Sequence, residues 1–399
     1  MESTVVDLTG SDSVAADPNH NKALGREVAA IILGDSVEEL RELARRLPDL
    51  KFSRYAGDWD RGGIYTPIAS AVAHNKMDVF EFLINKAVLL EEQVILGFWN
   101  GRRRNGTVLS LAVRVIHFFQ FQAIKYAEIL CKSGANVHAD VVSTEQPLAV
   151  LLQSSDQIAD PQLFKSAMEL ACLFISILQR NNEINEISKD GLGYIHDRNL
   201  HPWVLKMLLV AGADKGLRTR DTSITPLHAL LHAKHAPELL RILIEEYDCD
   251  VNEKDAQNQN ALQRILHTVQ QKRLVNPLWT RTIQVLFDNK INVDFLVGDD
   301  ARFFSDLNRL PQFKKIRAYR VMPLVVWNLL QLGHPPQFLE PVDMNLLPMN
   351  NTTTQIHEFL ERDRDQREAA ITSASNFFLL PDELRALILH ESTFPFYKT

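Results

Sequence analysis

The stretch Asp221-Thr-Ser-Ile-Thr-Pro-Leu-His-Ala-Leu-Leu231 decides the fold, together with Glu238-Leu-Leu-Arg-Ile-Leu-Ile244 and Asp250-Val-Asn252. Pro226 suits the first turn of a helix, where a missing N–H costs no hydrogen bond, and Thr225 before it can cap free N–H groups. The segment predicts two short antiparallel helices with more apolar residues than such a pair can bury: Leu227, Leu230, Leu231, Leu239, Leu240, Ile242, Leu243 and Ile244. A unit of this kind must stack on neighbouring units, so further copies are expected.

This segment resembles one ankyrin repeat almost from end to end, with its Thr-Pro-Leu-His turn and its Asp-Val-Asn exit. Other copies follow at the period of about 33 residues that is typical of this repeat type. About seven are found, beginning near residue 22 and at Thr66, Thr107, Pro147, Gly193, Asp221 and Asp255. The resemblance covers about residues 22–296. It implies an all-α ankyrin-repeat solenoid of stacked helix pairs with hairpin loops, which binds a partner protein through its groove and hairpin tips.

The repeat motif assigns structural roles to several residues. Thr66 and Pro67 occupy the positions of Thr225 and Pro226, and Leu227 and His228 complete the turn. The resemblance implies that the imidazole of His228, and that of His196 in the stretch 193–196, hydrogen-bonds neighbouring turns. Asn258 stands where the repeat has glycine, a substitution that the left-handed backbone region tolerates.

Three histidines, His228, His232 and His235, are spaced i, i+4 and i+7, which is compatible with metal ligation on one helix face. No cluster of cysteines or carboxylates in the sequence completes such a site. We therefore predict a structural role for these residues, with neither a metal nor a cofactor.

Insertions lengthen some of the copies. The span from Thr107 to Gly134 is six residues longer than the equivalent span from Thr66 to Ala87, and residues 154–161 lengthen the next copy. Insertions in a repeat array map to loops on one face and often modify the binding surface.

Composition excludes several functional classes. The net charge of −7 argues against a nucleic-acid-binding face. Cys131, Cys172 and Cys249 lie in separate repeats and are read as buried thiols of a reducing compartment. No signal peptide is recognisable, and the longest apolar run, 321–332, is too short to span a bilayer. We therefore expect a cytoplasmic or nuclear protein that is not membrane-bound. Because catalytic motifs are absent from the sequence, we also expect that it is not an enzyme.

The sequence predicts three parts. Residues 1–20 are polar and are expected to be disordered, residues 21–296 form the repeat array, and residues 297–399 form a helical C-terminal capping region. Helices are expected in the last part near 300–309, 314–332, 353–374 and 381–391.

Within the polar tail, Val5-Val6-Asp7-Leu8-Thr9 resembles the core by which many nuclear proteins bind SUMO, the small ubiquitin-like modifier. The implied mechanism is β-augmentation, in which the peptide adds a strand to a sheet edge and its aliphatic side chains fill a groove. Five loosely specified residues also occur by chance, and the sequence leaves both interpretations open.

Two further segments are candidates for partner binding. Arg102-Arg103-Arg104 lies at a hairpin between repeats, where it would meet an acidic partner or form a solvated turn. Leu379-Leu-Pro-Asp-Glu-Leu-Arg-Ala-Leu-Ile-Leu389 resembles the opening of an F-box, which would make the chain a substrate receptor of a ubiquitin ligase. The later helices of an F-box are missing, and a plain capping helix that starts at Pro381 is the competing interpretation.

Overall fold

The computed structural model describes residues 18–47, 57–59, 63–86, 90, 94–99, 102–138, 146–155, 157–188, 191–220, 222–271, 278–297, 303, 306, 321–334, 347 and 350–378. The chain forms two compact units, Met1–Cys249 and Asp250–Thr399. The first holds most of the predicted repeats, and the second holds the last repeat and the C-terminal region.

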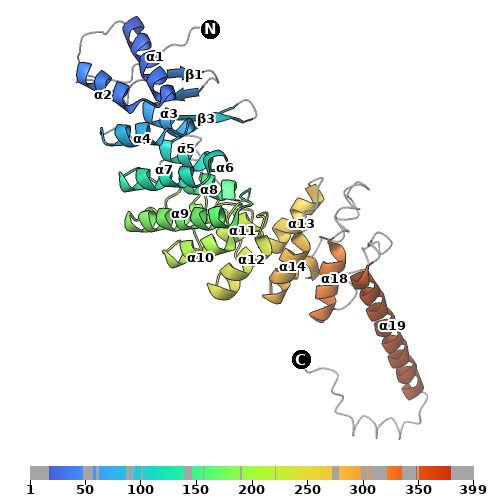
Figure 1. The fold of residues 1–399 in the computed structure, drawn as a ribbon. Helices are drawn as coiled ribbons and strands as arrows, with labels where there is room; N and C mark the ends of the chain where they lie inside the picture. The colour runs from blue at the N-terminus through green and yellow to red at the C-terminus, as the bar shows by residue number, and fades with distance from the viewer. Residues whose placement is uncertain are drawn as a thin grey trace. The chain divides into compact units, whose positions relative to one another are not determined.

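The first unit is a stack of helix pairs (Figure 1). After the first pair, each pair has a short first helix and a longer second helix, and several neighbouring second helices pack on each other. The helices are α1 (Pro18–Gly34), α2 (Val37–Arg46), α3 (Pro67–Ala73), α4 (Met77–Ile84), α5 (Val108–Arg114), α6 (Ile116–Phe119), α7 (Phe121–Lys132), α8 (Pro147–Ser155), α9 (Pro161–Arg180), the 3-10 turn η1 (Tyr194–His196), α10 (Pro202–Val210), α11 (Pro226–Leu230), α12 (Ala236–Arg241) and its π-helical continuation η2 (Ile242–Glu246).

Two antiparallel hairpins connect pairs in the N-terminal half of this unit. Strands β1 (Gly57–Trp59) and β2 (Gly63–Tyr65) lead into α3, and strands β3 (Val94–Trp99) and β4 (Arg102–Gly106) lead into α5. In the second hairpin the residue pairing shifts between Ile95 and Gly97. The hairpins therefore follow the repeat pattern, since each one joins a second helix to the next first helix.

The core of the unit is the interior of the stack. The side chains of α3 from Ile68 to Val72 are fully buried, which a helix with one solvent-exposed face would not permit. Tyr126 of α7 packs edge-on against Phe80 of α4, with 4.8 Å between the ring centroids, and its hydroxyl donates to Asn75 Oδ1 at 3.4 Å. Burial raises the pKa of the Tyr126 phenol far above its ordinary value. Apolar contact between successive pairs thus forms one continuous core.

The second unit contains α13 (Ala261–Gln271), α14 (Trp279–Asp288), α15 (Asp294–Val297), α18 (Met322–Gln331) and α19 (Asn351–Phe378). Helix α13 packs on α14, α14 on α18 and α18 on α19. In α18 the side chains of Val325, Val326 and Leu329 are fully buried. An amide pair, Gln284 and Asn328, joins α14 to α18 at 3.3–3.4 Å.

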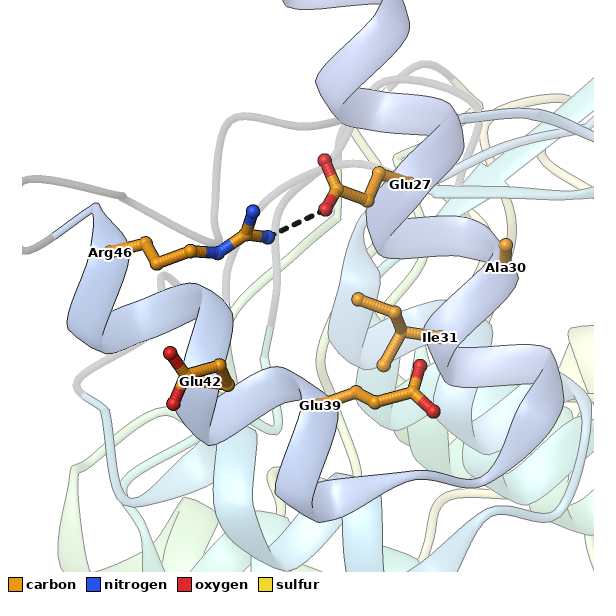
Figure 2. A pocket seen from close by; sticks show the side chains of 6 residues that line it. All are labelled: Glu27, Ala30, Ile31, Glu39, Glu42 and Arg46. Carbon is orange, nitrogen blue, oxygen red and sulfur yellow. Dashed lines mark hydrogen bonds and ion pairs between the residues drawn. The ribbon is translucent and has the colours of Figure 1, made fainter.

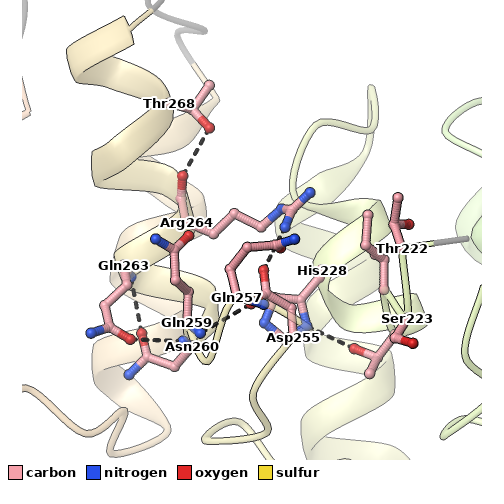
Figure 3. A network of polar contacts seen from close by, with 12 residues as sticks. Thr222, Ser223, His228, Asp255, Gln257, Gln259, Asn260, Gln263, Arg264 and Thr268 are labelled. Carbon is pink, nitrogen blue, oxygen red and sulfur yellow. Dashed lines mark hydrogen bonds and ion pairs between the residues drawn. The ribbon is translucent and has the colours of Figure 1, made fainter.

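A polar network lies at the start of the repeat in the second unit (Figure 3). Asp255 Oδ1 accepts hydrogen bonds from the backbone N–H groups of Gln257 and Gln259, at 2.9 and 3.0 Å, and Oδ2 pairs with Arg264. Asn258, inside this turn, has φ 58°, so the predicted left-handed asparagine is confirmed. At the start of α13, Asn260 and Gln263 cap each other reciprocally, which replaces the threonine cap of other repeats.

The predicted all-α solenoid of stacked helix pairs with hairpin loops is confirmed for the first unit. The predicted helix pair at 22–47 is present, although α1 begins at Pro18, inside the segment expected to be disordered. Helix α18 covers part of the expected segment 314–332, and α19 covers all of the expected segment 353–374. The expected helix at 381–391, and nearly all of that at 300–309, lie outside the described residues.

Among the described residues, one helix, α9, is long and apolar enough to cross a membrane, with 20 residues and a mean hydropathy of 1.3. Its apolar side chains, including Leu170, Ala171 and Phe174, are buried inside the stack, while Lys165 and Glu169 are exposed. This pattern is typical of a core helix in a repeat array. Composition alone does not distinguish such a core helix from a membrane-spanning helix.

The stack makes Leu243 a sensitive position, since its side chain is fully buried. Leu243→Ala should lower the free energy of unfolding by about 2–5 kcal/mol through lost apolar transfer and the cavity left behind. Chemical denaturation followed by circular dichroism measures this change. Leu192→Ala is the matched control, because Leu192 is 47% exposed and its loss should cost no more than about 0.5 kcal/mol. Equal denaturation of the two variants would contradict the stacked core.

Candidate protein-binding surface

The three predicted arginines lie on the second hairpin, next to its turn. Arg102 pairs with Trp99, Arg103 with Phe98 and Arg104 with Gly97. The backbone of these three arginines therefore lies at a hairpin between repeats, as expected. Contact of these residues with a partner stays a prediction.

Threonine caps fix both hairpins to the helices that follow. Thr66 Oγ1 accepts a hydrogen bond from Ala69 N at 3.3 Å, and Pro67 opens α3. Thr107, directly after β4, accepts a hydrogen bond at Oγ1 from Ser110 N at 3.3 Å. Each cap satisfies a free N–H group at the start of its helix and so fixes the residue at which the helix begins after the hairpin.

Thr225 does not cap its helix as predicted. Its hydroxyl lies 2.8 Å from Nδ1 of His228, and no side-chain cap bond to the backbone is present. Both residues are buried, so the imidazole and the hydroxyl satisfy each other where water is excluded. Pro226 opens α11 and Leu227 is fully buried, as the motif requires.

His196 bridges two turns, which is the role that the resemblance implied. Gly193 N donates to Nδ1 at 3.2 Å, and Nε2 lies 2.9 Å from the carbonyl oxygen of Leu217 in the next turn. This arrangement assigns the proton of the neutral ring to Nε2. Burial lowers the pKa of His196, because a charged imidazole would lose its hydration.

His235, the last of the three spaced histidines, has ring contacts of its own. His235 precedes α12, and its ring lies edge-on to that of His201, with 5.4 Å between centroids. His201 in turn contacts Phe164 of α9 at 5.9 Å. Each of these three residues lies at the N-terminal end of a second helix.

A polar cluster of the buried His138 and Tyr194 with the exposed Glu186 has no signature in the sequence. His138 Nε2 lies 2.8 Å from Glu186 Oε2, and His138 Nδ1 lies 3.0 Å from the hydroxyl of Tyr194. Burial raises the pKa of Tyr194, so the phenol stays protonated and can donate to the ring. The partners are about 50 residues apart in sequence, and no local pattern signals their contact.

The insertion after α5 forms a surface feature that residue patterns alone did not identify. Helix α6 occupies it, with Ile116 fully buried, while Phe118 is 80% exposed and Phe121 is 48% exposed. The predicted lengthening of this copy is observed, and it takes place between the two helices of the pair. In the sequence, Phe118 and Phe121 look like core residues, since they stand in an apolar run.

A shallow groove lies between α1 and α2 (Figure 2). Ala30 and Ile31 line it, together with Glu27, Glu39, Glu42 and Arg46. Arg46 pairs with Glu27 at 2.8 Å, and Glu42 pairs with Arg45 outside the groove. The carboxylates are thus partly neutralised by exposed arginines of the same helix pair.

Two predicted elements lie outside the described residues. They are the SUMO-binding motif, with Val5, Val6, Asp7, Leu8 and Thr9, and the F-box-like segment 379–389.

Comparison with solved structures found ankyrin repeat domains among the similar chains. No protein-family model matches the chain, and no curated protein sequence matches it. Among solved structures, the ankyrin repeat domain of Bcl-3, a member of the IkappaB protein family, is 16% identical with a TM-score of 0.44, and the match covers 65% of this chain and 96% of that one. The human ASB11 ankyrin repeat domain is 15% identical with a TM-score of 0.42, covering 67% and 98%. A chain from the structure of a predatory endopeptidase of Bdellovibrio bacteriovorus in complex with an immunity protein is 20% identical with a TM-score of 0.32, covering 53% and 95%. At these values the similarity concerns the fold and not a shared function.

The bridging role of His196 predicts a pH dependence of stability. Its pKa is lowered in the folded chain. As the pH falls, the unfolded chain therefore takes up a proton on this ring before the folded chain does, near the ordinary pKa of about 6.5. The stabilisation is therefore complete above that pH and is lost as the pH falls toward the folded pKa. His196→Asn should unfold about 1–2 kcal/mol more easily at pH 7.5 and lose less stability than the wild type between pH 7 and pH 5.

Thermal denaturation at a series of pH values measures both effects. His117→Asn, at an exposed position on α6, is the control and should keep the wild-type profile. A His196→Asn profile parallel to that of the wild type would contradict the assignment.

Proposed function

We propose that this chain is a protein-binding scaffold that engages a partner through its groove and hairpin tips. The observation that supports this most directly is the join between the second hairpin and the stack. Three consecutive arginines follow the hairpin turn, and Thr107 caps α5 directly after the strand that carries them. A charged loop held on a rigid element binds with little loss of conformational entropy.

The charge of this hairpin indicates the kind of partner. Arg102, Arg103 and Arg104 concentrate positive charge in a chain whose net charge is −7. Such a local reversal favours encounter with an acidic surface and disfavours contact between two copies of the same hairpin. The partner on this face is thus a protein with exposed carboxylates.

Neutralising the hairpin should therefore abolish partner capture. Proximity labelling with the full chain in cells, followed by mass spectrometry, should recover a defined set of proteins with the wild type and lose them with Arg102→Ser/Arg103→Ser/Arg104→Ser. The matched control is Arg41→Ser/Arg45→Ser/Arg46→Ser, which removes the same charge from exposed positions on α2. Recovery of the same proteins with both variants would refute a role of the hairpin.

We further propose that the N-terminal tail recruits SUMO, which would link the bound partner to a modifier pathway. Support comes from the sequence: Val5, Val6 and Leu8 are aliphatic, and Asp12 and the serines at 11 and 13 follow them. A β-prone peptide of this kind can add a strand to an open sheet edge, while acidic residues meet basic groups beside the groove.

A peptide of residues 1–16 should bind SUMO with a Kd of about 10–100 μM, as is typical of a short segment that becomes ordered on binding. Val6→Ala/Leu8→Ala should abolish binding, because the aliphatic anchors are lost while the charge is unchanged. Asp7→Asn, which keeps the anchors, should weaken binding only partly. NMR titration of labelled SUMO is the measurement, and a titration without shifts along the edge strand would reject the motif.

A further inference from the structure

The insertion between α5 and α7 presents two exposed aromatic rings on a short, anchored segment. Phe118 has the largest exposed fraction, 80%, among the large apolar side chains of the described residues, and Phe121 has 48%. Ile116, two residues before Phe118, is fully buried and fixes the segment to the core. Single exposed apolar residues are ordinary, but two rings on one turn are a feature to explain.

The backbone between the two rings is strained. Gln120 has φ 48° and ψ −122°, the values of the first central residue of a type II′ turn, which strongly favours glycine. Hydrogen bonds hold it there: Gln120 N donates to Ile116 O at 2.8 Å, and Ala123 N donates to Gln120 O at 3.0 Å. Strain of this kind persists where the surroundings enforce it, and it clusters at sites that bind ligands. The turn thus holds Phe118 and Phe121 in a fixed relation.

This surface is separate from the arginine hairpin. Helix α5 begins one residue after β4 ends and reaches Arg114 just before the insertion. Its seven residues span about 10 Å at 1.5 Å per residue, so the hairpin and the insertion lie at opposite ends of one helix.

Basic residues flank the two rings in the sequence. Arg114 stands four positions before Phe118, and Lys125 stands four positions after Phe121, whereas no carboxylate lies between Arg114 and Lys125. Lys125 is an exposed residue four positions after Phe121, and its ion pair with Glu81, at 3.8 Å, is exposed on both sides. An exposed pair of this kind contributes at most about 1 kcal/mol, so Lys125 can exchange it for a partner's carboxylate.

Further rings continue from the insertion along the stack. Phe164 in the first turn of α9 contacts His201 before α10, and His201 contacts His235 before α12. Since α7 packs on α9, α9 on α10 and α10 on α12, these rings follow the N-terminal ends of successive second helices. With 8–10 Å between packed helices, the row extends about 25–30 Å, the length of about eight extended residues.

We propose that Phe118 and Phe121, flanked in the sequence by Arg114 and Lys125, form a docking site for an acidic segment of a partner protein that carries apolar anchor residues. Aromatic residues are enriched among the groups that dominate binding energy, and they act best when a rim of complementary charge surrounds them. A basic segment would meet like charges at this site, and so would a second copy of the same surface.

Selection from a displayed library of random 12-residue peptides tests the chemistry of this site even while the partner is unidentified. The full chain is the target, and Phe118→Ala/Phe121→Ala is the counter-selection target. Enriched peptides should combine several Asp or Glu residues with aromatic or aliphatic residues, and should lose at least 10-fold in affinity on the double variant. Lys125→Glu should weaken them several-fold. Enrichment of neutral or basic peptides, equal binding to the double variant, or no enrichment would overturn the proposal.

Control variants separate this site from folding and from the hairpin. Val210→Ala removes an apolar side chain that is 71% exposed at the last residue of α10, and it should bind the selected peptides like the wild type. Gln120→Gly keeps both rings and suits the positive φ at this position, so it should bind the selected peptides like the wild type without lowering the Tm. The Arg102→Ser/Arg103→Ser/Arg104→Ser variant should also bind these peptides normally, so failure at one surface does not imply failure at the other.

Discussion

The apolar surface that a single helix pair cannot cover is the constraint on which this structure depends. In α3 every side chain from Ile68 to Val72 is enclosed, and Leu243 is enclosed in the same way at the far end of the first unit. Each fully buried aliphatic side chain contributes about 1.5–3 kcal/mol, and it does so only when a neighbouring pair is in place. Stacking is therefore the condition under which each pair is stable at all.

Because the interior fixes the helices, variation is confined to the segments that connect them. The hairpins join one pair to the next, and the turns inside a pair join its first helix to its second. The second hairpin carries a run of arginines, whereas the insertion after α5 carries exposed rings and the strained Gln120. A single scaffold thus offers one end of α5 to a charged contact and the other end to an apolar one.

Local features were predictable from sequence where their cause is local. The Thr-Pro turn at Thr66 and the left-handed Asn258 depend on a few adjacent residues, and both are observed. Thr225 was predicted wrongly because the buried ring of His228 competes for its hydroxyl, which no propensity for capping describes. The bond between His138 and Tyr194 needs two distant turns to meet. The exposure of Phe118 was equally unpredictable, since an inserted phenylalanine has the same hydropathy as a buried one.

The position of the repeat that matches the ankyrin pattern best has a consequence for biosynthesis. This repeat, with α11 and α12, stands at the C-terminal end of the first unit, whereas the more divergent pair α1–α2 stands at its beginning. At about 5–20 residues per second, translation needs on the order of ten seconds or more to proceed from one to the other. Each repeat emerges with an apolar face that stays uncovered until the next repeat has been synthesised. The order of synthesis therefore runs from divergent repeats to the best-matched one, which is added last in the first unit.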